Sequence, residues 1–87
     1  MPRYFFSTTN GHRLSDDEGD LLPDDAAARS MAIDILSEVL PSQRDHLDLG
    51  GRYLVTVSGE DETALYEIEA TGRRLSSAGG LPLKRTD

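Results

Sequence analysis

One segment of this chain has the apolar spacing of an amphipathic helix, while the segments before and after it alternate like β-strands. Apolar side chains recur every three or four positions along residues 24–40. They are Ala28, Met31, Ala32, Ile35, Leu36 and Val39. A single helix buries its apolar face only against other elements, and here only strand-like segments remain. The sequence therefore predicts an α+β fold of order β-β-α-β-β, with one helix packed on one face of an antiparallel sheet.

The predicted helix has clear signals at both ends. Asp24 can cap the free backbone N–H groups of the first turn, and Asp25 adds negative charge at the positive end of the helix dipole. Pro41 lacks a backbone N–H and disfavours helical angles at Leu40. We therefore expect the helix to begin at Asp24 and to stop before Pro41.

The N-terminal segment predicts a hairpin. Residues 3–9 are rich in aromatic and β-branched side chains, and they end at Asn10-Gly11, a dipeptide typical of tight hairpin turns. The returning arm, residues 12–15, is short, and the acidic run 16–20 ends it. We expect a brief edge strand blunted by charge.

A second hairpin is predicted after the helix. Residues 52–58 and 63–70 both alternate between apolar and polar side chains, and residues 59–62 have turn composition. The apolar members are expected to lie under the helix: Tyr53, Val55, Val57, Tyr66 and Ile68. Residues 41–51 are polar apart from two leucines, so we expect a connection there.

Length and charge divide the chain in the same place. With 87 residues it has room for one domain, which we place at residues 1–72. Residues 73–87 have no usable period, and we expect a flexible basic tail. Residues 1–72 hold fifteen acidic and five basic side chains, a net charge of −10, whereas residues 73–87 carry +3. Because an acidic body repels phosphate, the folded part is not expected to bind nucleic acid.

Composition also excludes several classes of site. The chain has no cysteine, which removes disulfides, thiolate nucleophiles and cysteine-based metal sites. It has no apolar run of about 18 residues that could span a bilayer, and its start lacks a signal-peptide pattern. We expect a cytoplasmic protein without membrane contact.

The first half of the chain contains a distinctive set of motifs: Pro2-Arg3-Tyr4-Phe5-Phe6, Asn10-Gly11, and Asp17-Glu18-Gly19 followed by Leu22-Pro23-Asp24. In these motifs the chain resembles a family of short proteins, abundant in rhizobia and other alphaproteobacteria, that is catalogued as a domain of unknown function. The resemblance covers roughly residues 2–70. It implies a compact αβ domain in a bacterial cytoplasm, and it implies no activity. Members commonly have histidine after the paired aromatic residues, where this chain has Ser7.

No catalytic arrangement is visible in the sequence. Ser58 lies at an expected strand end without the Gly-x-Ser-x-Gly pattern of a nucleophile elbow. Glu67 and Glu69 share the strand face opposite the expected core, where exposure leaves both carboxylates ordinary. We predict that the protein is not an enzyme, and we nominate no catalytic residue and no cofactor. A site formed between protomers by these glutamates and two histidines is a third hypothesis.

Metal binding has weak support. The acidic run 16–20 could direct alternate carboxylates at one cation. A calcium loop, however, needs glycine and glutamate where this chain has Leu21 and Ala27. His12 and His46 have no nearby partner at metal-ligand spacing. We nominate no metal ligand, and cation binding by the acidic run stays an open question.

The aromatic cluster Tyr4, Phe5 and Phe6 is one candidate contact surface. Strand alternation places Phe5 on the opposite face from the other two. Since one helix covers one face, an exposed ring on the other face would suit a partner or a second copy. In the alternative interpretation, a loop or the tail folds over the ring, with Leu75, Leu81 or Leu83 as the covering side chain.

The tail is the other candidate surface. Its cations are Arg73, Arg74, Lys84 and Arg85. They could order on an acidic partner or an anionic surface, or fold back on the acidic body. Our main hypothesis is a non-enzymatic accessory or protein-interaction module, with a protein partner or a homodimer formed through an edge strand or the uncovered sheet face. The alternative is nucleic-acid or regulatory binding through the tail, which would weaken steeply with salt.

Overall fold

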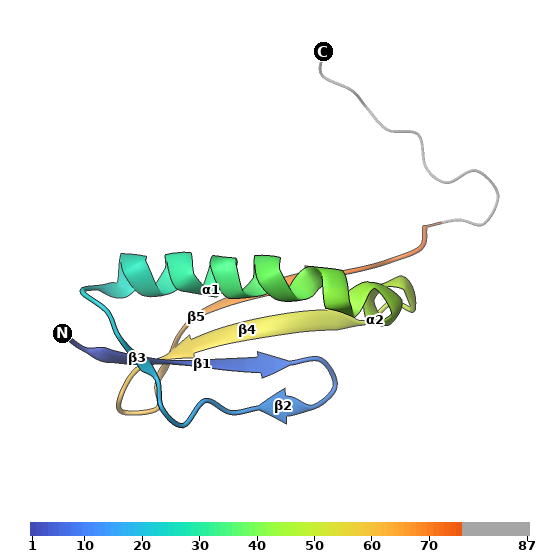
Figure 1. Cartoon of the computed structure of the whole chain (residues 1–87). Helices are drawn as coiled ribbons and strands as arrows, with labels where there is room; N and C mark the ends of the chain where they lie inside the picture. Colours follow the sequence, from blue (N-terminus) through green and yellow to red (C-terminus); the bar gives the residue numbers. More distant parts are fainter. Residues whose placement is uncertain (76–87) are drawn as a thin grey trace, which may run out of the picture.

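The computed structural model describes residues 1–75 and places one layer of helices on one antiparallel sheet (Figure 1). The strands are β1 (Arg3–Thr9), β2 (Arg13–Leu14), β3 (Asp20–Leu21), β4 (Arg52–Ser58) and β5 (Ala64–Thr71). The helical elements are α1 (Asp25–Val39), the 3-10 helix η1 (Leu40–Gln43) and α2 (Arg44–Asp48). This arrangement confirms the predicted α+β class with an antiparallel sheet.

The sheet is built around β1 and β4, which lie side by side in its centre. Its order is β2-β1-β4-β5, and β3 pairs with the start of β1, so β2 and β3 share one edge. Val55 of β4 lies opposite Thr8 of β1 and Ile68 of β5. Both predicted hairpins are present, and β5 forms the second edge.

The first hairpin differs from its prediction in two details. The returning strand β2 holds only Arg13 and Leu14, so Asn10–His12 form a three-residue loop. Gly11 has a φ of +102° in this loop, a backbone conformation that glycine adopts without strain. The acidic run also does not simply end the edge, because Asp20 pairs with Tyr4 as part of β3.

Helix α1 begins as predicted and ends before Pro41, but the expected effect of Pro41 on Leu40 is wrong, because Leu40 keeps helical angles with φ −50° and ψ −44°. Asp24 is the N-cap, and its side chain accepts a hydrogen bond from the Ala27 N–H at 2.9 Å. The predicted connection over residues 41–51 contains helical structure that the sequence analysis did not predict, namely η1 and α2. Pro41 stands at the start of η1, where a missing N–H breaks no helical hydrogen bond. None of the helices described is long and apolar enough to cross a membrane.

The core lies between α1 and the sheet face it covers. Its buried hydrophobic members are Tyr4, Phe6, Ala28, Ala32, Leu36, Tyr53, Val55 and Val57. The two alanines let α1 approach the sheet closely, and Ala32 and Val55 are both 0% exposed. Alternation in β4 buries every second residue, which confirms the predicted inner face of this strand.

Tyr4 joins the sheet to the first turn of α1. Its hydroxyl donates a hydrogen bond to Asp25 Oδ1 at 2.6 Å. This bond, together with burial and the charges of Asp25 and Asp24, raises the pKa of Tyr4 to about 12. Because the folded pKa exceeds the ordinary value of 10.0, the associated stability is present below pH 10 and is lost as the pH rises through about 12.

We expect an ultraviolet titration of the folded protein to contain a phenolate component with a midpoint near pH 12. Replacing Tyr4 by phenylalanine removes this component, because the hydroxyl that Asp25 holds neutral is absent. Circular dichroism at each pH identifies the range in which the chain stays folded. If the same high component persists in Tyr4→Phe, it belongs to another tyrosine and the assignment is wrong.

Candidate functional site

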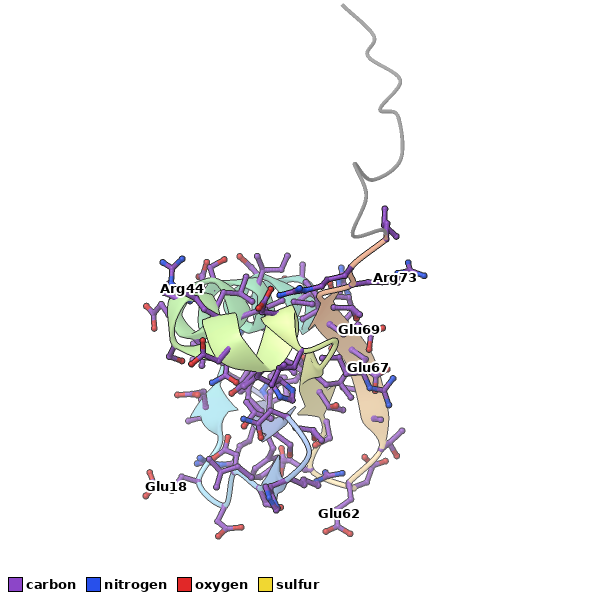
Figure 2. All side chains as sticks on the ribbon, turned by 90° about the vertical axis from the view of Figure 1, so that its right-hand side faces the viewer. Glu18, Arg44, Glu62, Glu67, Glu69 and Arg73 are labelled. Carbon is purple, nitrogen blue, oxygen red and sulfur yellow. The ribbon has the colours of Figure 1, made fainter. Side chains whose placement is uncertain are left out.

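One face of the sheet is left uncovered by α1, and we call it the open face. Phe5 and Ser7 of β1 and Thr56 and Ser58 of β4 point toward this side, because alternate residues bury against the helix. On β5 the same alternation exposes Glu67 and Glu69, which Figure 2 shows on the flank of the domain next to Arg73. The open face therefore combines hydroxyl groups, one aromatic ring and carboxylates.

A hollow of about 480 Å³ lies on the open face. Its floor is formed by Phe5 and by the hydroxyl side chains Ser7, Thr56 and Ser58. One wall is the segment between β2 and β3, and the other is the β4–β5 turn. Four carboxylates line these walls: Asp16, Asp17, Glu60 and Glu62.

Asp16 anchors the first wall. Its Oδ2 accepts a hydrogen bond from the Phe6 N–H at 3.0 Å, and its Oδ1 accepts from the Glu18 and Gly19 N–H groups at 3.1 and 3.0 Å. Partial burial opposes ionisation of Asp16, but these three backbone donors outweigh it and lower the pKa of the carboxyl group. Asp16 therefore holds the loop against β1, and both its oxygens are already engaged.

The electrostatics of the hollow favour a cation. Arg13 is the one positively charged side chain in the lining, and its Nη2 donates to Ser7 Oγ at 3.4 Å. Ser7 is buried, with 6% of its surface exposed. The carboxylates of Asp17 and Glu62 belong to exposed residues at the walls. A ligand with a guanidinium or ammonium group would meet more negative than positive charge here.

A known protein family matches most of the chain. The family model described as Domain of unknown function (DUF6894) matches residues 3–71. The chain belongs to this family. The match runs from the first residue of β1 to the last residue of β5, and it confirms the expectation from the N-terminal motifs that the chain is a domain of unknown function. No curated protein and no solved structure matches the chain.

In this DUF6894 domain only one of the three aromatic candidates reaches the open face. Tyr4 and Phe6 are 4% and 8% exposed and belong to the core, because their side of β1 faces α1. Phe5 is half-buried on the other side, where Gly19 lies against its ring. Leu75 is 59% exposed, so it does not cover Phe5. Within the described residues, the segment that holds Gly19 is thus the one that lies beside this ring.

The basic candidates are divided by the end of the described residues. Arg73 is exposed, and Arg74 donates a hydrogen bond to Asp48 Oδ2 at 3.0 Å. Arg74 thus contacts the acidic body at α2. Lys84 and Arg85 lie outside the described residues, as do Leu81 and Leu83.

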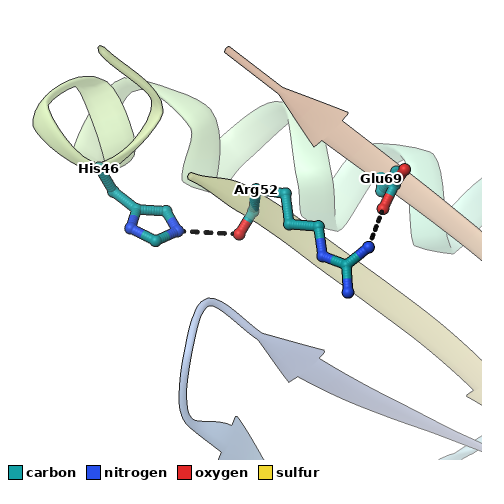
Figure 3. Close-up of polar contacts among 3 residues, drawn as sticks. All are labelled: His46, Arg52 and Glu69. Atoms are coloured by element: carbon teal, nitrogen blue, oxygen red, sulfur yellow. Dashed lines mark hydrogen bonds and ion pairs between the residues drawn. The ribbon is translucent and has the colours of Figure 1, made fainter. Parts of the chain in front are cut away.

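The two histidines of the DUF6894 domain lie apart from the hollow. His46 Nε2 is 2.8 Å from the Arg52 carbonyl oxygen (Figure 3). The backbone oxygen of His46 accepts a hydrogen bond from the Gly51 N–H at 2.9 Å. Since a carbonyl only accepts, Nε2 carries the proton, and His46 fastens α2 to the start of β4. His12 is exposed in the first hairpin loop. Over residues 1–75, no group of three or more histidine, aspartate or glutamate side chains could hold a metal ion.

Proposed function

We propose that this domain is a non-enzymatic protein-interaction module of the cytoplasm that binds a positively charged segment of another protein on its open face. One observation carries the proposal: a hollow of about 480 Å³ with a floor of hydroxyls and Phe5 and with four carboxylates in its walls. A lysine or arginine side chain fits this chemistry, because its apolar stem can lie on an aromatic ring while its charged end reaches carboxylates.

The charge of the whole body supports such a partner. Residues 1–72 carry a net charge of −10, and an acidic field of this kind raises the rate at which a basic segment arrives. The chemistry of the hollow also supports binding over catalysis. Its serine and threonine hydroxyls have no imidazole within the lining, which is the base that most often activates such a nucleophile.

Glu62 belongs to the wall of the hollow and has an uncommon backbone conformation. It is the one non-glycine residue of segment 1–75 with a positive φ, at 65°. Its backbone N–H donates to the Gly59 carbonyl at 3.1 Å, which closes the β4–β5 turn. A left-handed residue at this place is common in short hairpin loops, so the positive φ of Glu62 shapes the turn that forms the wall.

Replacing Glu62 by glycine is expected to change stability and binding in opposite directions. Glycine adopts a positive φ without steric cost, so we expect the free energy of unfolding to rise by up to about 1 kcal/mol. Loss of the carboxylate should weaken binding of a basic peptide about two- to fivefold. Urea denaturation and fluorescence anisotropy measure the two effects. A variant that is more stable and binds with unchanged affinity would remove Glu62 from the binding surface.

The proposal itself is tested with two labelled nonapeptides of matched sequence, one carrying lysines and one carrying glutamates at the same positions. We expect the full-length protein to bind the basic peptide and not the acidic one. The double variant Asp17→Asn/Glu62→Gln should bind about three- to tenfold more weakly. The control Asp34→Asn/Glu38→Gln removes equal charge from the exposed side of α1 and should leave the affinity within about twofold.

Two outcomes contradict the proposal. If both double variants weaken binding equally, the peptide follows net charge and the hollow has no special part. If neither peptide binds, a basic partner is excluded at this surface. The alternative role of the tail is tested separately, by retention from a cell lysate on the full chain and on a chain ending at Gly72. Nuclease-sensitive retention that needs residues 73–87 would support nucleic-acid binding instead.

A further inference from the structure

The two edges of the sheet are treated differently by the chain. Along β1, every second residue directs its backbone groups away from β4, and each of these residues has a partner. Tyr4 pairs with Asp20 of β3, and Thr8 pairs with Leu14 of β2. Between them, the Phe6 N–H donates a hydrogen bond to Asp16. Along β5, only β4 is a neighbour, and no other strand of segment 1–75 joins it. An eight-residue strand is thus left with one unpaired side.

The register shows which backbone groups of β5 are free. The Phe6 N–H points away from β4, toward Asp16, and hydrogen-bond direction alternates along each strand of an antiparallel pair. In β4 the odd-numbered residues therefore face β5, where they lie opposite the even-numbered residues of β5. After the irregularity at the start of β5, its odd-numbered residues direct their N–H and C=O groups outward. They are Glu67, Glu69 and Thr71. The Gly72 N–H points inward, to the Gly51 carbonyl at 3.3 Å, as this alternation requires.

The charge on this edge selects against acidic or identical strands. Glu67 and Glu69 are exposed on it, and β5 contains no lysine or arginine. If two copies paired antiparallel through β5 with Glu67 or Ile68 at the centre, Glu67 would lie opposite Glu67 or Glu69 of the other copy. Like charges directly opposite destabilise a strand pair. A strand with cations at alternate positions would instead place each one opposite a carboxylate.

We propose that the outer edge of β5 receives an extended basic segment of a partner protein as an additional strand, with lysine or arginine at two-residue spacing opposite Glu67 and Glu69. The inference deepens the proposed function, since both take a basic segment as ligand, but it names the edge and the binding mode. Figure 2 shows Glu62, Glu67 and Glu69 on the β5 side, so such a strand would run toward the wall of the hollow.

Arg52 leaves Glu69 accessible to this partner. Its Nη1 is 3.5 Å from Glu69 Oε2, and the two side chains are 69% and 44% exposed (Figure 3). A pair this open to water is weak and exchanges readily with other ions. Replacing Arg52 by glutamine should therefore strengthen binding of a basic strand about twofold to fivefold.

The test uses the full chain labelled for NMR and a probe peptide with alternating lysine and valine residues. On binding, the amide hydrogens of Glu67, Glu69 and Thr71 should exchange at least tenfold more slowly, because they gain partners. The amides of Ile68 and Ala70 already face β4 and should change little. A peptide N-methylated along the edge that pairs with β5 should not bind, and one methylated along the opposite edge should bind as before.

Charge reversal provides the matched variants. The variant Glu67→Lys/Glu69→Lys should no longer bind the lysine peptide and should bind a peptide with glutamate at the same positions. The control Asp34→Lys/Glu38→Lys should lose less than a third of its affinity for the lysine peptide. If the lysine peptide binds with no protection of the three β5 amides, the edge inference is overturned while the proposed function stands. If these amides are protected without peptide and the protein sediments as a dimer, a second copy occupies the edge and the inference is also overturned.

Discussion

Replacing Asp16 by alanine is expected to lower the free energy of unfolding by about 3 kcal/mol. The carboxylate accepts hydrogen bonds from the backbone N–H groups of three residues: Phe6, Glu18 and Gly19. Its loss leaves the Phe6 N–H on the outer side of β1 without a partner and releases the loop that joins β2 to β3. Urea denaturation followed by circular dichroism measures the change.

The neighbouring residue is the control for this substitution. Asp17 is exposed and makes no described hydrogen bond, so Asp17→Ala should change the free energy of unfolding by no more than about 0.5 kcal/mol. Equal losses in Asp16→Ala and Asp17→Ala would show that acidity in this run, and not the three hydrogen bonds, stabilises the loop.

The same carboxylate predicts a pH dependence of known sign. Because the pKa of Asp16 in the folded chain is lower than its ordinary value of 3.8, its stabilising effect is fully present above pH 3.8. The effect is lost as the pH falls below 3.8 through the folded pKa. Wild-type stability should therefore fall more steeply in this acidic range than that of Asp16→Asn. Parallel curves for the two proteins would contradict the assignment.

Replacing Phe6 by alanine should be the most damaging single truncation in β1, with a loss of about 3–5 kcal/mol. Phe6 is 8% exposed and belongs to the cluster between α1 and the sheet, so its removal leaves a cavity that the alanines of α1 cannot fill. Small domains have total stabilities near the lower end of about 5–15 kcal/mol. Thermal denaturation should therefore find the variant partly unfolded at room temperature.

Phe5 is the matched position, one residue away on the opposite face. Because its ring is half-buried in the open face, Phe5→Ala should cost no more than about 1–2 kcal/mol. It should also weaken binding of the basic peptide, an effect that a folded core variant such as Phe6→Leu should not show. If Phe5→Ala destabilises the chain as much as Phe6→Ala, the ring is a core residue and the open face loses its aromatic contact.

Alternation within β1 made the orientation of Phe5 predictable. It did not predict that the segment between β2 and β3 would lie beside the Phe5 ring and form a wall of the hollow. The contact between Gly19 and Phe5 joins residues fourteen positions apart, and neither residue carries a periodic signal. Asp16 lies in an acidic run whose composition favours a solvated edge. The sequence does not show that Asp16 accepts three backbone hydrogen bonds. The one local signal is Gly19, whose φ of +70° allows the loop to turn back toward Asp16.

The sequence by itself determined the elements whose signals are local. Asp24 sets the start of α1 because capping acts within one helical turn, Pro41 marks the change from α1 to η1, and alternation set the inner faces of β4 and β5. Only the tertiary structure decided how these elements use their edges. The two-residue strands β2 and β3 are too short to have a period, and they exist because β1 offers them backbone partners. Pairing of β2 and β3 with β1 closes one edge of the sheet, while β5 has no such partner among the described strands. The segment between β2 and β3 also forms one wall of the hollow. The sequence could not show this, because strand pairing and loop position depend on residues that are distant along the chain.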